Sequence, residues 1–342
     1  MPSSTSSFEE RSIPPGRWAA TWVVALVVAA LATWRLERVS RSHGQRPSVG
    51  DEAILWSLAR HTVDNDRRVV AFVGSSRLAL GYSQEAFREA APNLHGVQLA
   101  INGAQAQGVL ADLAADESFR GIAVVDLLEW DVGVPSAFTA AKPFVDRART
   151  LWRAPSAVAN RYLALFAQSR LALLAMGGHH FLTWLVARGS WPSPTYIVSD
   201  RDRVMHGDYS LAEPNELQRQ RETRVVDFFA NIPTPEVWLT TAMNELEPLV
   251  LAIRAHGGDV VFVRMPISGV LARDFDRGFP RAAYWDAFAA RTSARTIHAR
   301  DVPALANLTC PDDMHLDQRD QEMFTRRIVE AMRARDVFKG RE

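Results

Sequence analysis

A histidine and an aspartate near the C-terminus, together with two serines far upstream, are the residue types of a serine-based catalytic triad. Asp312 and His315 form an Asp-x-x-His pair, and Ser75 and Ser76 follow the apolar run 69–73 and Gly74. A serine hydroxyl becomes a useful nucleophile when an imidazole takes its proton and a carboxylate fixes the tautomer of that imidazole. The pattern predicts acyl chemistry, with His315 as the base and Asp312 as the residue that orients it.

Each of these residues also has a structural explanation. An aspartate ahead of a helix that begins near Asp317 is favoured by the helix dipole, and His315 would then be a surface residue. A serine after a strand is a common turn or cap residue. A serine at the end of a buried strand together with an Asp-x-x-His pair favours catalysis, but it leaves Ser75 and Ser76 as competing nucleophiles.

The elements that must position these residues alternate along the chain. Apolar segments predict buried strands at 69–73, 97–101, 121–127, 259–263 and 295–298. Helical patterns lie at about 84–91, 105–115, 235–256, 281–293 and 317–335. Such alternation predicts an α/β fold with a parallel sheet covered on both faces, and sites in such sheets gather beyond the carboxyl ends of the strands. Ser76, Asn102 and Arg264 would fall at those ends.

Length and composition narrow the class of protein. The 342 residues suit one large α/β domain with an insertion, because the two parts of the proposed triad span nearly the whole chain. Lys plus Arg (39) equals Asp plus Glu (39), so no global charge favours nucleic acid. Cys310 is the only cysteine; it leaves the redox compartment open and is expected to be a small buried residue.

The N-terminal region predicts a membrane anchor. Residues 18–34 carry no charge and are bracketed by Trp18 and Trp34, which suit the membrane interface. The alternative is a secretory signal peptide cleaved after Ala30-Leu31-Ala32. Residues 1–17 are expected to be a disordered cytoplasmic tail, and residues 35–65 a linker followed by an amphipathic helix from about Glu52 to His61.

The charges that flank the span bear on its orientation. Arg11 and Arg17 precede it, and Arg35, Arg38, Arg41 and Arg46 follow it. Taken alone, this count would leave the globular part in the cytoplasm. A cleaved signal peptide would export the globular part, and so would an anchor in the orientation that the family resemblance given below implies.

Residues 132–232 interrupt the alternation and predict a mainly helical insertion. It contains a helix-like segment, Ala157 to Trp184, and then a loop rich in Pro, Ser and Asp from Ser190 to Ser210. Its aromatic residues could line a substrate groove, touch the membrane or a partner, or pack onto the core; they are Tyr162, Phe166, Phe181, Trp184 and Trp191. His179 and His180 lack further ligands at metal-binding spacing, so no metal site is predicted.

With Gly74-Ser75-Ser76 after a strand and Asp-x-x-His near the end, the chain resembles the SGNH (GDSL-like) hydrolase superfamily. The resemblance implies a three-layer, flavodoxin-like SGNH domain over residues 66–342, and it assigns the nucleophile to Ser76. It implies an oxyanion hole made by the backbone of Ser76 and by Gly103. Asn102 could add its side-chain amide or could cap the following helix.

The third block of the family normally supplies an asparagine, but this chain has Asp126, Glu129 and Asp131 there. That departure, with Gly-Ser-Ser in place of Gly-Asp-Ser, resembles divergent members that accompany bacterial polysaccharide acylation, including the teichoic-acid D-alanylation and alginate O-acetylation groups. The resemblance covers roughly residues 66–130 and 257–335. It implies a single-pass protein of the bacterial inner membrane with a periplasmic domain.

The expected function is therefore a membrane-anchored SGNH-type O-acyltransferase or esterase that modifies a cell-envelope polysaccharide. Arg77 and Arg264 follow strands and are candidates to bind the substrate, with buried ion pairs as the alternative. No metal or organic cofactor is implied, and a multi-span membrane acyltransferase is the expected partner. A free-standing esterase and a catalytically silent scaffold subunit of a polysaccharide export complex are the rival hypotheses.

Overall fold

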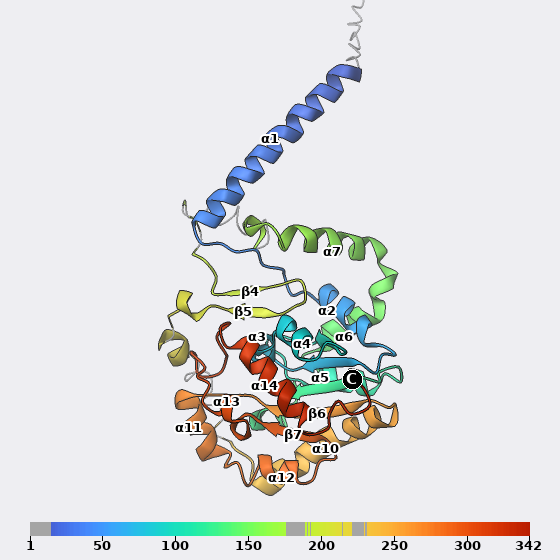
Figure 1. The fold of residues 1–342 in the computed structure, drawn as a ribbon, viewed down its shortest axis with the longest axis vertical. Helices are drawn as coiled ribbons and strands as arrows, with labels where there is room; N and C mark the ends of the chain where they lie inside the picture. Colours follow the sequence, from blue (N-terminus) through green and yellow to red (C-terminus); the bar gives the residue numbers. More distant parts are fainter. Residues whose placement is uncertain are drawn as a thin grey trace, which may run out of the picture.

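A five-stranded parallel sheet forms the centre of the molecule (Figure 1). The computed structural model describes residues 15–175, 189, 191, 193–213, 215–220, 229 and 231–342. The strands are β1 (Val69–Val73), β2 (His95–Gln98), β3 (Ile122–Asp126), β6 (Asp259–Arg264) and β7 (Arg295–His298). They lie in the order β2-β1-β3-β6-β7 and all neighbours run parallel.

Helices cover both faces of the sheet, because successive side chains of a strand point to opposite faces. In β1, Val69, Ala71 and Val73 join one core cluster, and Val70 and Phe72 join the other. The first cluster is covered by α2 (Ala53–Arg60), α5 (Gln107–Ala114), α6 (Lys142–Thr150), α10 (Pro235–Ala255), α11 (Gly269–Gly278) and α12 (Trp285–Ala289). The second is covered by α3 (Ser76–Gly81), α4 (Gln84–Ala90), α13 (Pro303–Ala306) and α14 (Gln321–Arg333).

The remaining elements connect or extend this core. Short 3₁₀ helices are η1 (His61–Val63), η2 (Glu129–Asp131), η3 (Leu151–Arg153), η4 (Ala172–Leu174), η5 (Tyr209–Leu211) and η6 (Ala299–Asp301). Between β3 and β6 lie α7 (Pro155–Gln168) and an antiparallel hairpin of β4 (Ile197–Ser199) and β5 (Met205–Gly207).

The predicted strands are confirmed, with one difference in β2. The apolar pattern predicts 97–101, whereas the strand begins at His95, whose N–H donates to the Arg68 carbonyl. His95 and Gly96 are not buried, so an apolar pattern cannot detect them. Residues after Gln98 still bond to the neighbouring chain, with Leu99 N–H donating to the Phe72 carbonyl at 2.8 Å.

The predicted helix boundaries differ more. The segment 281–293 contains only the short α12, and α14 begins at Gln321, not at 317. Neither α3 nor α11 was predicted. Helix α3 has six residues, of which only Ser76 is not buried, so it lacks the alternation of apolar and polar faces that marks a helix in a sequence. Helix α11 has ten residues and follows β6 after a four-residue connection.

The N-terminal helix α1 (Pro15–Ser42) extends beyond the predicted span at both ends, so the predicted tail and linker are wrong for 15–17 and 35–42. Residues 35–42 contain no helix breaker, and Glu37 pairs with Arg41 one turn later. The helix ends at Ser42, and Gly44, with a φ of +80°, turns the chain so that Gly44 N–H donates to the Arg41 carbonyl and Gln45 N–H to the Ser40 carbonyl. The segment Gly16–Ser42 is long and apolar enough to cross a membrane. Residues 1–14 lie outside the described part.

The segment of the insertion predicted as a loop, Ser190 to Ser210, contains the β4–β5 hairpin. Arg203, which has a φ of +65° in the turn between the two strands, fixes this hairpin to the core. Its guanidinium donates to the carbonyls of Gln98 and Ala100 and pairs with both carboxylate oxygens of Asp51. His179, His180, Phe181 and Trp184 lie outside the described residues.

Candidate active site

Ser76 is the first residue of α3, directly beyond the carboxyl end of β1. The turn between them needs Gly74, because a Cβ there would lie 2.8 Å from Asp126 Cβ and 3.1 Å from Leu78 Cβ. Ser75 is the N-cap of α3, and its hydroxyl accepts from the Arg77 N–H at 3.5 Å. The two competing serines therefore have different contacts, and Ser75 serves the helix.

A continuous hydrogen-bonded row joins Ser76, His315 and Asp312. Ser76 Oγ lies 2.8 Å from His315 Nε2, and His315 Nδ1 lies 2.7 Å from Asp312 Oδ2. A carboxylate only accepts, so the proton of the ring is assigned to Nδ1 and Nε2 is left to accept from the serine hydroxyl. The expected contact between Ser76 and His315 is present. The row has the geometry required of a nucleophile, a base and an orienting acid.

Backbone groups hold Asp312 in place. Its Oδ1 accepts from the N–H of His315 at 2.8 Å and from the N–H of Met314 at 3.2 Å. Asp312 is 1% exposed and His315 7%, so the pair is shielded from bulk water, whereas Ser76 is half-buried. Because both carboxylate oxygens of Asp312 accept hydrogen bonds, the carboxylate has a fixed orientation relative to the imidazole.

The next residue, Asp313, caps a helix, but this helix is α11 and not the C-terminal helix for which the sequence alternative proposed Asp312. Its Oδ2 accepts from the N–H groups of Val270 (2.9 Å) and Leu271 (3.4 Å) in the first turn of α11. Its φ is +67°, and Gly269 must lack a side chain because a Cβ would lie 2.0 Å from Asp313 Oδ1. Asp313 thus ties the loop that carries His315 to α11, a role that sequence reasoning missed.

Gly103 lies in a tight turn beside the nucleophile loop. The Ala104 N–H donates to the Ile101 carbonyl at 3.1 Å, and Gly103 has a φ of +79°, as the third residue of a type II turn requires. Ile101 N–H in turn donates to the Gly74 carbonyl at 2.9 Å, which fixes this turn next to the segment that leads into Ser76. Asn102 and Gly103 are both exposed, and the Gly103 N–H donates to no other described residue.

The two arginines proposed to bind substrate lie instead in buried ion pairs. Arg77 Nη2 is 2.8 Å from Asp126 Oδ1 and 3.7 Å from Asp131 Oδ2. Arg264 Nε is 3.0 Å from Glu129 Oε2. The arginine side chains are 3% and 6% exposed, so both are directed into the protein and the ion-pair alternative describes them.

Burial controls the charges of this cluster. Loss of hydration raises the pKa of Asp126, and it raises the pKa of Asp131 to about 6, against the opposing attraction of Arg77. Burial also lowers the pKa of Arg264, and the attraction of the Glu129 carboxylate opposes this shift. The three acids stand where the family resemblance called for an asparagine. A sequence signal for them existed: two arginines at or just after strand ends need carboxylate partners, and three acids lie within residues 126–131, at the end of β3 and directly after it.

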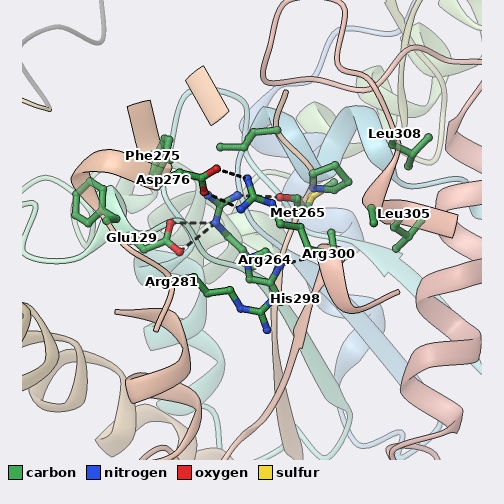
Figure 2. A pocket seen from close by; sticks show the side chains of 15 residues that line it. Glu129, Arg264, Met265, Phe275, Asp276, Arg281, His298, Arg300, Leu305 and Leu308 are labelled. Atoms are coloured by element: carbon green, nitrogen blue, oxygen red, sulfur yellow. Dashed lines mark hydrogen bonds and ion pairs between the residues drawn. The ribbon is translucent and has the colours of Figure 1, made fainter. Parts of the chain in front are cut away.

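A small cavity adjoins Arg264 beyond the ends of β6 and β7 (Figure 2). Its volume of about 30 Å³ has room for only about two water molecules. Arg264 points to Glu129 there and Arg300 to Asp276, while burial and the nearby arginines lower the pKa of His298 to about 3. Neither Ser76 nor His315 lines it, so it is a packed ion-pair cluster and not a substrate pocket.

A larger groove opens on the other side of Glu129. It has a volume of about 480 Å³ and is lined by residues that follow β3 and by the start of α10, among them Trp130, Gly133, Val237 and Thr241. Trp130 offers an aromatic surface, partly covered by Phe275 at a centroid distance of 4.8 Å. This groove lies beyond the carboxyl end of a neighbouring strand of the same sheet as Ser76.

Comparisons with known proteins add no relative. No family model matches the chain, and the searches of curated proteins and of solved structures each find no match.

Proposed function

We propose that this protein is a membrane-anchored serine acyltransferase, or an esterase with the same machinery, that acts on a polysaccharide of the bacterial cell envelope. The observation that carries the proposal is the row from Ser76 through His315 to Asp312, with contacts of 2.8 and 2.7 Å. A bond of this kind activates a serine that would otherwise be a weak nucleophile.

The architecture supports membership of the SGNH superfamily. The sheet order, in which the first strand lies between the second and third and the later strands follow, is the flavodoxin-like order. Ser76 lies beyond the strand that begins the sheet, and Asp312 and His315 precede its last helix, as the resemblance implies.

In the proposed reaction, Ser76 Oγ attacks the carbonyl carbon of an acyl donor while His315 Nε2 takes the hydroxyl proton. The negative oxygen of the tetrahedral intermediate is met by the N–H groups of Ser76 and Gly103. The bond to the leaving group then breaks, His315 returns the proton to that group, and the acyl group remains on Ser76. Asp312 steadies the imidazolium throughout.

In the second half, a sugar hydroxyl attacks the acyl-serine and His315 takes its proton. Ser76 leaves and recovers the proton, and the acyl group is now on the glycan. Water in place of the sugar gives the esterase. We propose a multi-span membrane acyltransferase as the source of acyl groups, with α1 in the inner membrane and the domain in the periplasm. Cleavage of the domain by protease added to intact spheroplasts is expected, and cleavage only after lysis would reverse this orientation.

A catalytically silent scaffold is the second candidate. It is favoured by the absence of the third-block asparagine, because Asp126 and Glu129 at that place are committed to Arg77 and Arg264. The scaffold needs no reactive serine, so serine reactivity separates the two functions.

The test is covalent labelling of the purified full chain with a fluorophosphonate that reacts with activated serines. The folded wild-type protein is expected to be labelled at Ser76, as located by peptide mass spectrometry. Ser76→Ala should abolish labelling, and Ser75→Ala is the matched control that should retain it. A folded wild-type protein that resists the reagent would favour the scaffold.

A further inference from the structure

One face of α7 is apolar and exposed. Tyr162 is 55% exposed, Leu163 69% and Phe166 62%. Leu163 and Phe166 are three residues apart, so they lie together on the helix surface. Exposure of three large apolar side chains on one helix is a feature of surfaces that contact a membrane or another protein.

The opposite face of α7 is fixed to the body of the protein. Arg161, 5% exposed, donates from Nη2 to the Gly50 carbonyl, and Gln168 Oε1 accepts from the Gly50 N–H at 3.3 Å. Val158 is buried on the same side. These contacts fix the orientation of α7 on the domain, so Leu163 and Phe166 are directed outward.

The end of α7 is also joined to the helix that leaves the domain. Both carboxylate oxygens of Glu37 in α1 accept hydrogen bonds from the first turn of η4, from Ala172 N–H at 2.9 Å and Leu173 N–H at 3.0 Å. Arg41 Nη2 donates to the Arg170 carbonyl at 2.8 Å. Glu37 follows Trp34 by three residues, or about 4.5 Å along the helix axis. The C-terminal end of α7 is thus held at the level where the apolar span ends.

Figure 1 shows α7 running across the side of the domain from which α1 departs. Basic side chains surround the apolar face: Arg153 precedes α7, and Arg170 follows it with its guanidinium 3.9 Å from the Phe166 ring centre. Arg38 lies over the Trp34 ring of α1 in the same way, at 4.9 Å. Aromatic and apolar residues between arginines match the boundary between lipid chains and phosphate headgroups.

We propose that the outer face of α7 lies in the interfacial layer of the bilayer leaflet that α1 leaves, with Leu163 and Phe166 among the lipid chains and Arg170 at the phosphates. The inference rests on the membrane span of the proposed function. It makes α7 a second membrane contact at a fixed angle to the domain, so the domain holds one orientation over the bilayer.

The test uses fluorescent probes on the full chain in phospholipid nanodiscs. Leu163→Cys places an environment-sensitive fluorophore on α7, and Leu251→Cys is the matched control, since Leu251 is a similarly exposed leucine (54%) on α10, remote from α1 in Figure 1. Leu26→Cys marks the middle of α1. The native thiol of Cys310 is 1% exposed, and the labelled wild-type protein gives its background.

A lipid that carries a nitroxide near its headgroup should quench the probe at 163 at least about twofold more than the probe at 251, and the emission at 163 should shift to the blue. A mid-chain nitroxide should quench the probe at 26. If 26 is quenched and 163 behaves as 251 does, the inference is overturned while the membrane span stands. If 26 is not quenched, the span and the inference both fail. Blue-shifted emission at 163 without lipid quenching would identify a protein contact instead.

Discussion

Two groups of polar side chains lie at the carboxyl ends of the central strands. One group is a hydrogen-bonded row that reaches the surface, and the other is a set of buried ion pairs. Ser76, His315 and Asp312 form a row whose outer member reaches the surface. Arg77, the neighbour of Ser76 in sequence, turns inward to Asp126 and belongs to the buried cluster. Adjacent residues of one helical turn therefore point to different partners: Ser76 to His315 and Arg77 to Asp126. Position at a strand end does not by itself mark a substrate-binding residue.

The largest expected effect is on the row. His315→Ala should slow fluorophosphonate labelling by on the order of 10⁴ to 10⁶, because the serine loses its base. Asp312→Ala should slow it roughly ten to a hundred times less, because that residue orients the ring without taking the proton. Labelling rates at several reagent concentrations measure both. Equal losses in the two variants would contradict the separate roles, and circular dichroism checks that each is folded.

Changes in the buried ion pairs should lower the stability of the fold more than changes in the row of Ser76, His315 and Asp312. Arg77→Met leaves Asp126 buried without its cation and should lower the free energy of unfolding by about 3–5 kcal/mol. Ser76→Ala should change it by less than about 1 kcal/mol, since it removes one half-exposed hydroxyl. Urea unfolding of the two full-chain variants compares them directly. Adding Asp126→Asn to Arg77→Met should recover part of the loss, and no recovery would argue against the ion pair as its cause.

The cluster should also make stability depend on pH. The pKa of Asp131 is raised to about 6 by burial, above an unfolded value of about 3.9, so the folded state holds its proton more tightly. Its contribution to the free energy of unfolding therefore falls as pH rises from about 4 to about 6 and is constant above. Asp131→Asn removes this loss, so its stability relative to the wild type should improve by about 2 kcal/mol between pH 4 and pH 7. A relative stability that does not change with pH would contradict burial as the dominant effect.

The smallest expected effects concern the loop between the two groups. Asp313→Ala removes the carboxylate that caps α11 but keeps the Cβ at positive φ, and should cost about 1 kcal/mol. Asp313→Gly removes the same carboxylate and also the strained Cβ, so it should be about 1 kcal/mol more stable than the alanine variant. Thermal unfolding of the pair isolates the backbone part. Alanine at least as stable as glycine would show that the left-handed conformation is not maintained.

The sequence allowed the triad to be predicted because its evidence is local. Gly74 to Ser76 follows a fully buried strand, and Asp312 and His315 are three residues apart, so each half is visible in a short window. The family resemblance was needed to choose between Ser75 and Ser76. The parallel sheet was predictable for the same reason, since its inner strands are unbroken apolar runs.

What the sequence did not reveal depends on distant partners or on backbone geometry. Arg264 and Glu129 are separated by 135 residues, and nothing near either one identifies the other. Asp313 caps α11 through a left-handed backbone and an approach to Gly269 that only the fold creates. The hairpin was missed because its strands have three residues each, too few for an alternating pattern.

The bond between Ser76 and His315 joins residues that are 239 positions apart. A ribosome adds roughly 5–20 residues per second, so the histidine is synthesised some tens of seconds after the serine. Four strands of the sheet, β2, β3, β6 and β7, are also made in that interval. A nascent chain that has not reached His315 therefore carries its proposed nucleophile without the proposed base, so no acyl-serine is expected to form on it before the histidine is made.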